Sequence, residues 1–250
     1  MSNTTDRPTR AERKDAAREK ARRLREEVEA RRRRTRRLAV SGAAVGVLAV
    51  VVAVGAVVQA GRSAVTDGSA APANVVDGGV VAAGAPDAPE LAVYLDYACP
   101  ACAQFEAQDG EWLRSLAADG EISLVYKPIS ILDRYSTTRF STRAASAAGC
   151  VAETSPEAFG DFTAAMLARQ APESGPGLSN EQIWSVAESV GVDAAAEQCV
   201  LDERFTDWAA ATTDAASRAG VQGTPTVSVN GELLTDRSRA SIGAAVEAAG

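Results

Sequence analysis

Histidine is absent from this chain of 250 residues, and aromatic residues make up only 5% of it. The lack of histidine excludes Ser-His-Asp triads, Cys-His proteases, histidine-ligated zinc and c-type haem attached at a C-x-x-C-H motif. The hydrophobic 46% of the chain is supplied mostly by small side chains, Ala and Val. Any chemistry must therefore come from other residues, and the four cysteines are the most informative of these.

Charge is distributed unevenly along the chain. Residues 1–37 contain 15 Lys and Arg against 7 Asp and Glu, a net charge of +8, whereas residues 38–58 contain no charge. Since the net charge of the whole chain is −7, the remainder carries −15. Such an asymmetry indicates two compartments or two partners. Nucleic-acid binding by the basic arm is disfavoured, because acidic residues interrupt it and it has no aromatic residue for base stacking.

Residues 38–58 are long and apolar enough to cross a bilayer. As a helix, these 21 residues span about 30 Å, the thickness of a hydrocarbon core. Six arginines lie directly before them, against a single Arg62 after them, which places the N-terminus in the cytoplasm. We predict a basic cytoplasmic arm in residues 1–37, a transmembrane helix in residues 38–58 that contacts lipid, and a linker in residues 59–73.

A cleaved export signal is the alternative interpretation of this region. Residues 35–40 loosely resemble a twin-arginine export motif, and residues 58–60 could form a cleavage site. We favour the uncleaved anchor, because both the apolar stretch and the charged region before it are longer than is usual in a signal. Either interpretation places the rest of the chain outside the cytoplasm.

The Cys99-Pro100-Ala101-Cys102 segment lies between a predicted buried strand, residues 91–96, and a predicted helix. Free backbone N–H groups and the helix dipole stabilise a thiolate at a helix N-terminus. We therefore expect Cys99 to be an exposed nucleophilic thiolate, and Cys102 to be the shielded thiol that resolves mixed disulfides. The alternatives are an inert disulfide or half of a zinc site, although Cys150 and Cys199 do not supply the second C-x-x-C pair of a zinc ribbon.

The remaining pattern predicts an α/β fold. A strand at residues 122–126 follows the first helix, and a strand–helix–strand unit of this length implies parallel pairing. Residues 133–220 have a helical pattern. Residues 221–234 again predict strands, joined by a turn at Asn230-Gly231, and residues 238–249 predict a final helix.

Three segments together resemble the thioredoxin superfamily, and specifically its DsbA-like branch. They are Asp96-Tyr97-Ala98-Cys99-Pro100-Ala101-Cys102, Gly223-Thr224-Pro225-Thr226 and the turn at Asn230-Gly231. The resemblance implies a thioredoxin fold in residues 74–250 with a helical insertion at about 133–220, preceded by the single transmembrane helix. It also implies that Pro225 is a cis-proline facing the dithiol, and that Thr224 offers backbone hydrogen bonds to an extended substrate chain.

Two usual means of tuning the dithiol are missing. Many relatives carry a buried acidic residue six positions before the nucleophile, where this chain has Val93, and no histidine lies between the two cysteines. We therefore expect a less oxidising couple than that of the strongest oxidants. Asp96 or Lys127 could assist proton transfer to Cys102, but we favour the interpretation that both are solvated charges at strand ends.

Cys150 and Cys199 remain when the other two cysteines are assigned to the active site. Outside the cytoplasm they are expected to form a structural disulfide, which would close a loop of about 50 residues. Two buried free thiols are the alternative.

The leading hypothesis is a membrane-anchored, extracytoplasmic thiol–disulfide oxidoreductase. It would pass the Cys99–Cys102 disulfide to unfolded or partly folded exported proteins and be reoxidised by a redox partner in the membrane. It would need no cofactor other than the dithiol, no metal and no nucleic acid. A reductant or isomerase would use the same residues at a different potential. A non-catalytic binding module of the same fold, tethered to the envelope, is the alternative from another functional class.

Overall fold

The computed structural model describes residues 71–169 and 174–250. The predicted arm, transmembrane helix and most of the linker lie outside these ranges. The chain divides into two units, Met1–Ala60 and Gly61–Gly250, and every described residue belongs to the second. Within the described ranges, no helix is both long and apolar enough to cross a membrane.

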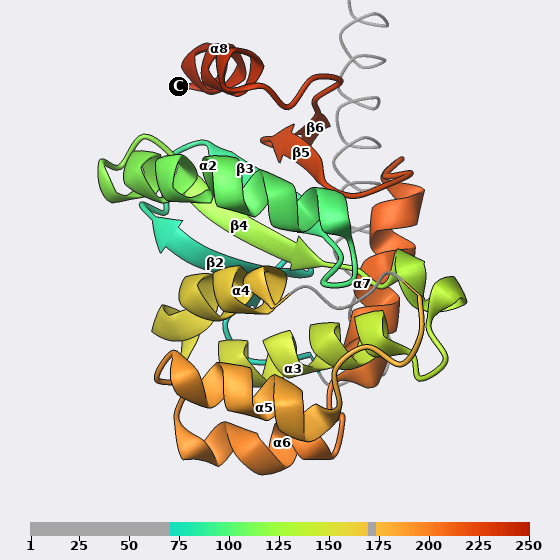
Figure 1. Ribbon diagram of the computed structural model, residues 1–250. Helices are drawn as coiled ribbons and strands as arrows, with labels where there is room; N and C mark the ends of the chain where they lie inside the picture. Colours follow the sequence, from blue (N-terminus) through green and yellow to red (C-terminus); the bar gives the residue numbers. More distant parts are fainter. Residues whose placement is uncertain (1–70, 170–173) are drawn as a thin grey trace, which may run out of the picture. The chain divides into compact units, whose positions relative to one another are not determined.

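A mixed sheet of six strands lies at the centre of this unit (Figure 1). The strands are β1 (Val75–Val76), β2 (Gly79–Gly84), β3 (Glu90–Leu95), β4 (Ser123–Pro128), β5 (Thr226–Val229) and β6 (Glu232–Leu233). Their order across the sheet is β1-β2-β4-β3-β5-β6. The β3–β4 pair is parallel, as the strand–helix–strand pattern predicts, and the other neighbouring pairs are antiparallel.

Helices follow the predicted order, with short 3₁₀ turns between them. The α-helices are α2 (Pro100–Ala118), α3 (Phe140–Thr154), α4 (Phe159–Ala168), α5 (Asn180–Ser189), α6 (Glu197–Leu201), α7 (Thr206–Arg218) and α8 (Arg239–Ala249). The 3₁₀ turns are η2 (Ile131–Tyr135), η3 (Pro156–Ala158) and η4 (Ala194–Ala196). A capping box is present at the start of α5, where the Ser179 and Gln182 side chains each accept a hydrogen bond from the other residue's backbone N–H.

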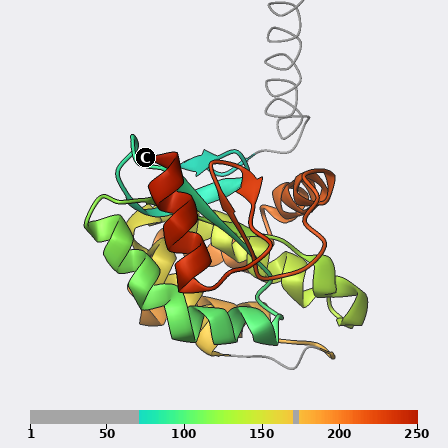
Figure 2. The ribbon, with the colours of Figure 1, turned by 90° about the horizontal axis from the view of Figure 1, so that it is seen from above.

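Both faces of the sheet are covered by helices (Figures 1 and 2). On β3, Leu91, Val93 and Leu95 face the core that α2 and α8 share, whereas Ala92 and Tyr94 face the opposite side. The C-terminal half of α7 covers this second side through Ala216. The last helix of the predicted insertion, α7, ends at Arg218, near the predicted end at about residue 220, and it also forms a layer on the sheet.

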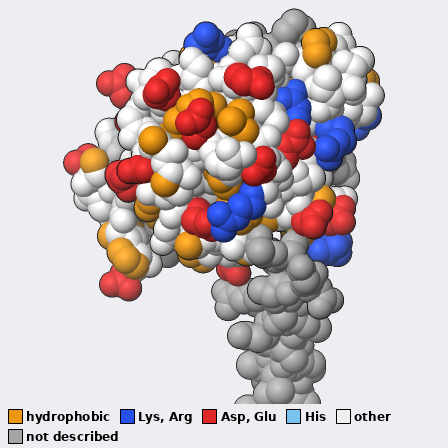
Figure 3. All heavy atoms as spheres, turned by 90° about the horizontal axis from the view of Figure 1, so that it is seen from below, with side chains coloured by type: hydrophobic (Ala, Val, Ile, Leu, Met, Phe, Trp, Pro, Cys, Tyr) orange, Lys and Arg blue, Asp and Glu red, His pale blue; other side chains and the backbone are white. Residues whose placement is uncertain are grey.

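The other helices of the predicted insertion are α3 to α6, and α4, α5 and α6 all pack against α3. This helix is buried along most of its length, and its Ala, Ser and Gly residues allow close approach of its neighbours. Phe205, just before α7, donates its backbone N–H to Ser146 Oγ at 3.0 Å. On the outer face of this block, acidic and basic side chains are interspersed with small hydrophobic patches (Figure 3).

Candidate active site

The Cys99–Cys102 segment forms the turn between β3 and α2. Cys99 is the N-cap of α2, with extended backbone angles (φ −83°, ψ 115°), and Pro100 occupies the first helical position. The Cys99 N–H donates to the Asp96 carbonyl at 2.9 Å, which closes the turn. The Cys99 carbonyl accepts from the N–H groups of Cys102 at 3.1 Å and Ala103 at 3.2 Å, so the helix begins at once. The first sulfur therefore lies at a helix N-terminus, where a thiolate is favoured.

The two thiols are free and have opposite acid–base properties. A hydrogen bond from the Cys102 thiol and the N–H groups of Cys102 and Ala101 lower the pKa of Cys99 to about 6, although burial acts in the other direction. Burial, together with the neighbouring Cys99, raises the pKa of Cys102 far above its usual value. At neutral pH, Cys99 is therefore the thiolate and Cys102 holds a proton.

The prediction that Cys99 is exposed is wrong in extent. Cys99 retains 6% of its accessible surface and Cys102 retains 1%. The enclosure of Cys99 has a clear cause, because its Sγ lies 3.3 Å from the Thr224 carbonyl oxygen, to which it donates a hydrogen bond when the thiol is protonated. The loop before β5 therefore covers the side of the sulfur that does not face the helix.

The Thr224–Pro225 peptide bond is cis. Strand pairing explains why this loop meets the dithiol, although more than 120 residues separate them in the sequence. β5 lies antiparallel to β3 with Thr226 opposite Tyr94, so the residues that precede β5 meet the residues that follow β3. The structure thus brings the predicted Thr224 and Pro225 to the two predicted cysteines.

Asp96 is not a solvated charge, as we had favoured, because it is fully buried. Its carboxylate accepts hydrogen bonds from the N–H groups of Ala98 and Leu132, both at 2.9 Å. Burial raises its pKa to about 6 despite these hydrogen bonds. Among the hydrogen bonds of the described residues, none joins this carboxylate to Cys102. Asp96 instead ties the active-site turn to η2, and its part in proton transfer stays a prediction.

Lys127 is buried as well, so it is not a solvated strand-end charge either. Its ammonium lies 3.3 Å from the Glu90 carboxylate and 5.5 Å from the centre of the Tyr94 ring. Glu90 is the first residue of β3, whereas Cys99 follows the end of that strand. The side chain thus extends away from the dithiol, and the structure does not bring its charge to Cys102.

Glu106 is a buried carboxylate near the dithiol that we did not identify from the sequence. It lies one turn beyond Cys102 on the inner face of α2, accepts a hydrogen bond from Tyr126 Oη at 2.9 Å and forms an ion pair with Arg114. Gly110 makes room for it, since a Cβ at Gly110 would lie 2.2 Å from Glu106 Oε1. A glutamate on the apolar face of a helix, followed by a mid-helix glycine, is the signal that could have revealed this group.

Tyr97 fastens the active-site turn to the helices of the predicted insertion. Its hydroxyl lies 3.2 Å from Thr163 Oγ1, and its ring packs edge-on against Phe162, with 6.1 Å between ring centres. Both partners belong to α4. The position of the dithiol thus depends on the helical block as well as on the sheet.

Cys150 and Cys199 form a disulfide that joins α3 to α6. This disulfide lies in the helical block, and neither of its cysteines belongs to the segments that form the active site. Within residues 71–169 and 174–250, no three Cys, Asp or Glu side chains are grouped so that they could hold a metal ion.

Comparison with known proteins shows what the chain is similar to. The family model described as thioredoxin matches residues 77–248, well over half of the chain. No curated protein sequence matches this chain.

Solved structures of several bacterial oxidoreductases superpose on the chain. The reduced DsbA of Mycobacterium tuberculosis aligns with a TM-score of 0.58 and 29% identity, covering 72% of this chain and 89% of that one. The disulfide bond oxidoreductase DsbG of the same organism aligns with 0.58 and 28%, covering 72% and 85%. MdbA of Corynebacterium diphtheriae, a thiol–disulfide oxidoreductase, aligns with 0.59 and 22%, covering 76% and 99%, and at this identity supports the fold alone.

Proposed function

The chain belongs to the thioredoxin family and is a thiol–disulfide oxidoreductase of the DsbA type, and from this premise we propose that it acts outside the cytoplasm as an oxidant of exported proteins. The observation that carries the proposal is the asymmetry of the dithiol. One sulfur is a thiolate at a helix N-terminus with a pKa of about 6, and the other is a buried thiol with a raised pKa. Such a pair can be attacked at one defined sulfur and regenerated by the other.

The reaction begins with the Cys99–Cys102 disulfide. A thiolate of the client attacks Cys99 Sγ, and the Cys102 sulfur leaves and takes up a proton. A second client thiolate then attacks the client sulfur of this mixed disulfide, and Cys99 leaves as a thiolate. The client loses two electrons and gains one disulfide, and the enzyme gains two electrons as a dithiol. A membrane redox partner would then remove those electrons and restore the enzyme.

The lowered pKa of Cys99 supports the oxidising direction. Stabilising the thiolate stabilises the reduced enzyme, which makes its disulfide a stronger oxidant. The pKa of about 6 lies within the usual range of about 3.5–7.5 for activated cysteines, but not at its lower end. We therefore expect a reduction potential between those of thioredoxin, about −270 mV, and of the strongest oxidants, about −120 mV.

The proposed location rests on the sequence before residue 71. The 21 uncharged residues at 38–58, and the six arginines before them, support an anchored protein with a cytoplasmic N-terminus. A membrane-impermeant thiol reagent applied to intact cells should label Cys99 in the reduced protein. Mass spectrometry of the membrane fraction should find the intact N-terminus, whereas a mature protein that begins near residue 61 would favour a cleaved signal.

The decisive experiment traps the reaction intermediate. In Cys102→Ser, the mixed disulfide between Cys99 and a client cannot be resolved, so adducts should accumulate and be visible by non-reducing electrophoresis of alkylated membranes. The matched variant Cys99→Ser should form none. The absence of adducts in Cys102→Ser, together with normal function of Cys99→Ser, would favour the non-catalytic binding module. A potential near −270 mV, with Cys99 and Cys102 found mostly reduced in cells, would favour a reductant.

A further inference from the structure

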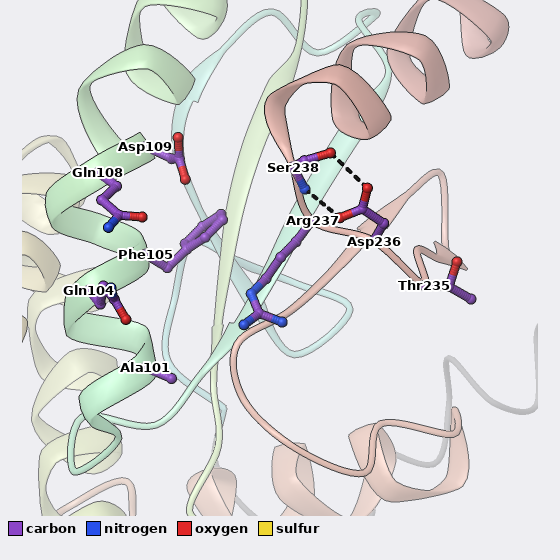
Figure 4. A pocket seen from close by; sticks show the side chains of 9 residues that line it. All are labelled: Ala101, Gln104, Phe105, Gln108, Asp109, Thr235, Asp236, Arg237 and Ser238. Carbon is purple, nitrogen blue, oxygen red and sulfur yellow. Dashed lines mark hydrogen bonds between the residues drawn. The ribbon is translucent and has the colours of Figure 1, made fainter.

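A polar groove of about 410 Å³ lies along α2, the helix that begins at the dithiol (Figure 4). One wall is a single face of α2 that begins at Ala101, between the two cysteines, and continues through Gln104 and Gln108. The other wall is the loop of residues 235–238, between β6 and α8. The buried ring of Phe105 lies between them. A client chain whose cysteine is joined to Cys99 has this groove within reach of its neighbouring residues.

Most charges around the groove already have partners. Asp109 accepts from Arg239 Nε at 2.6 Å, and that guanidinium also lies over the Trp112 ring, 5.2 Å from its centre. Asp236 accepts from the backbone N–H of Ser238 at 3.0 Å and from its hydroxyl at 2.7 Å. These contacts hold the loop and the start of α8 against α2. They also occupy the two carboxylates as hydrogen-bond acceptors.

Arg237 is different from Arg239, although the two lie two residues apart. Among the described residues, its guanidinium has no hydrogen bond and no ion pair, and it is exposed. Figure 4 shows its side chain extending from the loop between the two walls, toward the end of the groove where Ala101 lies. The side-chain amides of Gln104 and Gln108 are exposed on the facing wall. The groove therefore offers more unused donors than acceptors.

A carboxylate is the ligand that such a groove fits best. A guanidinium presents paired N–H donors in the geometry of a carboxylate, and a glutamine amide can add another donor. The negative charge of Asp236 next to Arg237 weakens this attraction, but its oxygens are already used by Ser238. The attraction is thus of the size expected for an exposed ion pair strengthened by hydrogen bonds, and not larger.

We propose that this groove binds the client segment next to the reacting cysteine, and that Arg237 selects clients with an Asp or Glu there. This inference rests on the proposed function, because it concerns the substrate preference of the same site. It assigns to Arg237 a role in specificity and none in the exchange of sulfurs.

The test uses the full-length protein, purified in detergent and oxidised at Cys99–Cys102. Its substrates are dithiol peptides identical except for one position, scanned over the four residues on each side of the first cysteine and filled with Glu, Gln or Lys. The readout is the second-order rate of peptide oxidation. At one or two of these positions, the wild type should oxidise the Glu peptide about three- to tenfold faster than its Gln partner.

Variants identify the source of this preference. Arg237→Gln should bring the ratio of the Glu to the Gln peptide close to one, and Arg237→Glu should favour the Lys peptide instead. Arg218→Gln removes an exposed arginine from α7, outside the groove, and should keep the wild-type ratio. Raised salt should reduce the wild-type preference and leave Arg237→Gln unchanged.

Two results would overturn the inference: a wild-type ratio of one at every position, or a preference that survives Arg237→Gln. Neither result affects the proposed function, because that function is tested by whether the Gln peptides are oxidised at all. If the wild type oxidises these and Cys99→Ser does not, the oxidoreductase function stands whatever the preference. If the wild type oxidises none of the peptides, the proposed function itself fails.

Discussion

The two cysteine pairs of this chain contain the same side chains in opposite surroundings. Cys99 and Cys102 are free thiols, the first at the N-cap of α2 and the second in the first turn of that helix. The pKa of Cys99 is lowered and that of Cys102 is raised. Cys150 and Cys199 join two helices in a disulfide, with Cys150 near the C-terminal end of α3. The position of a cysteine relative to a helix N-terminus, together with the groups that enclose it, thus separates a reactive pair from a structural one.

The largest expected difference between the pairs is in reactivity. In protein whose active site alone has been reduced, iodoacetamide should modify Cys99 at a rate that is half-maximal near pH 6 and level above pH 7, because the thiolate is the nucleophile. Cys102 should react at least about a hundredfold more slowly at pH 7, since its raised pKa leaves it protonated. Timed alkylation followed by peptide mass spectrometry measures both rates. Equal modification of the two, or a midpoint near 8.5, would contradict the asymmetry.

The second difference is in stability. The Cys150–Cys199 disulfide closes a loop across 49 positions, so its removal in the double variant Cys150→Ala, Cys199→Ala should lower the free energy of unfolding by about 4 kcal/mol. Urea denaturation followed by tryptophan fluorescence measures the change. Below the denaturation midpoint this variant should still oxidise peptides. Removal of the other pair, by Cys99→Ser with Cys102→Ser, should do the reverse, abolishing oxidation while keeping most of the stability.

The third prediction concerns the carboxylate that holds the active-site turn. The carboxyl of Asp96 titrates near 3.8 in the unfolded chain and near 6 in the native protein. Between these values, the native state keeps a proton that the unfolded state has lost, so stability falls as pH rises through this window. Asp96→Asn does not titrate.

The difference in unfolding free energy between Asp96→Asn and the wild type should therefore shift by about 2 kcal/mol in favour of the variant between pH 4 and pH 7. The contributions of the other carboxylates to the pH dependence cancel in this difference, because those groups are the same in both proteins. Urea denaturation at several pH values gives this difference. A difference that stays flat with pH would show that the burial of Asp96 does not affect its titration.

The smallest expected effect concerns the contact between the turn and the helical block. Tyr97→Phe removes the hydrogen bond with Thr163 and should cost about 1 kcal/mol of stability. A double-mutant cycle with Thr163→Val isolates the coupling between the two side chains. Tyr135→Phe is the matched control, because that tyrosine is 48% exposed. A coupling energy of zero would mean that the ring packing of Tyr97, not its hydroxyl, holds the turn.

Much of this fold could be predicted from local pattern. The short apolar run at residues 91–96 and the alternation of residues 122–126 indicate two strands around one helix. A connection of that length pairs them in parallel. The position of Cys99 follows from Pro100, which suits the first residue of a helix. These features depend on residues that are close in the sequence, so they can be predicted without a structure.

The surroundings of charged groups could not be predicted in the same way. Asp96 and Lys127 follow or end strands, where a charge is commonly solvated, yet η2 covers the first and the Glu90 carboxylate holds the second. The position of Glu106 on the apolar face of α2 indicates a buried carboxylate, but the sequence does not show that Tyr126 and Arg114 are its partners. Their partners come from distant segments, and no local periodicity shows which segments will meet.

The sequence by itself thus determined the chemistry of the protein, because two thiols spaced as C-x-x-C at the start of a helix form one redox unit wherever the rest of the chain lies. Only the tertiary structure decided how that unit is tuned and presented. It brought the Thr224 carbonyl to 3.3 Å from Cys99 Sγ and buried Asp96 and Glu106. It also placed Arg237 at the groove with no hydrogen bond or ion pair to any other described residue. The physical reason is that pKa shifts and grooves depend on desolvation and on contacts between distant segments, which exist only after the chain has folded.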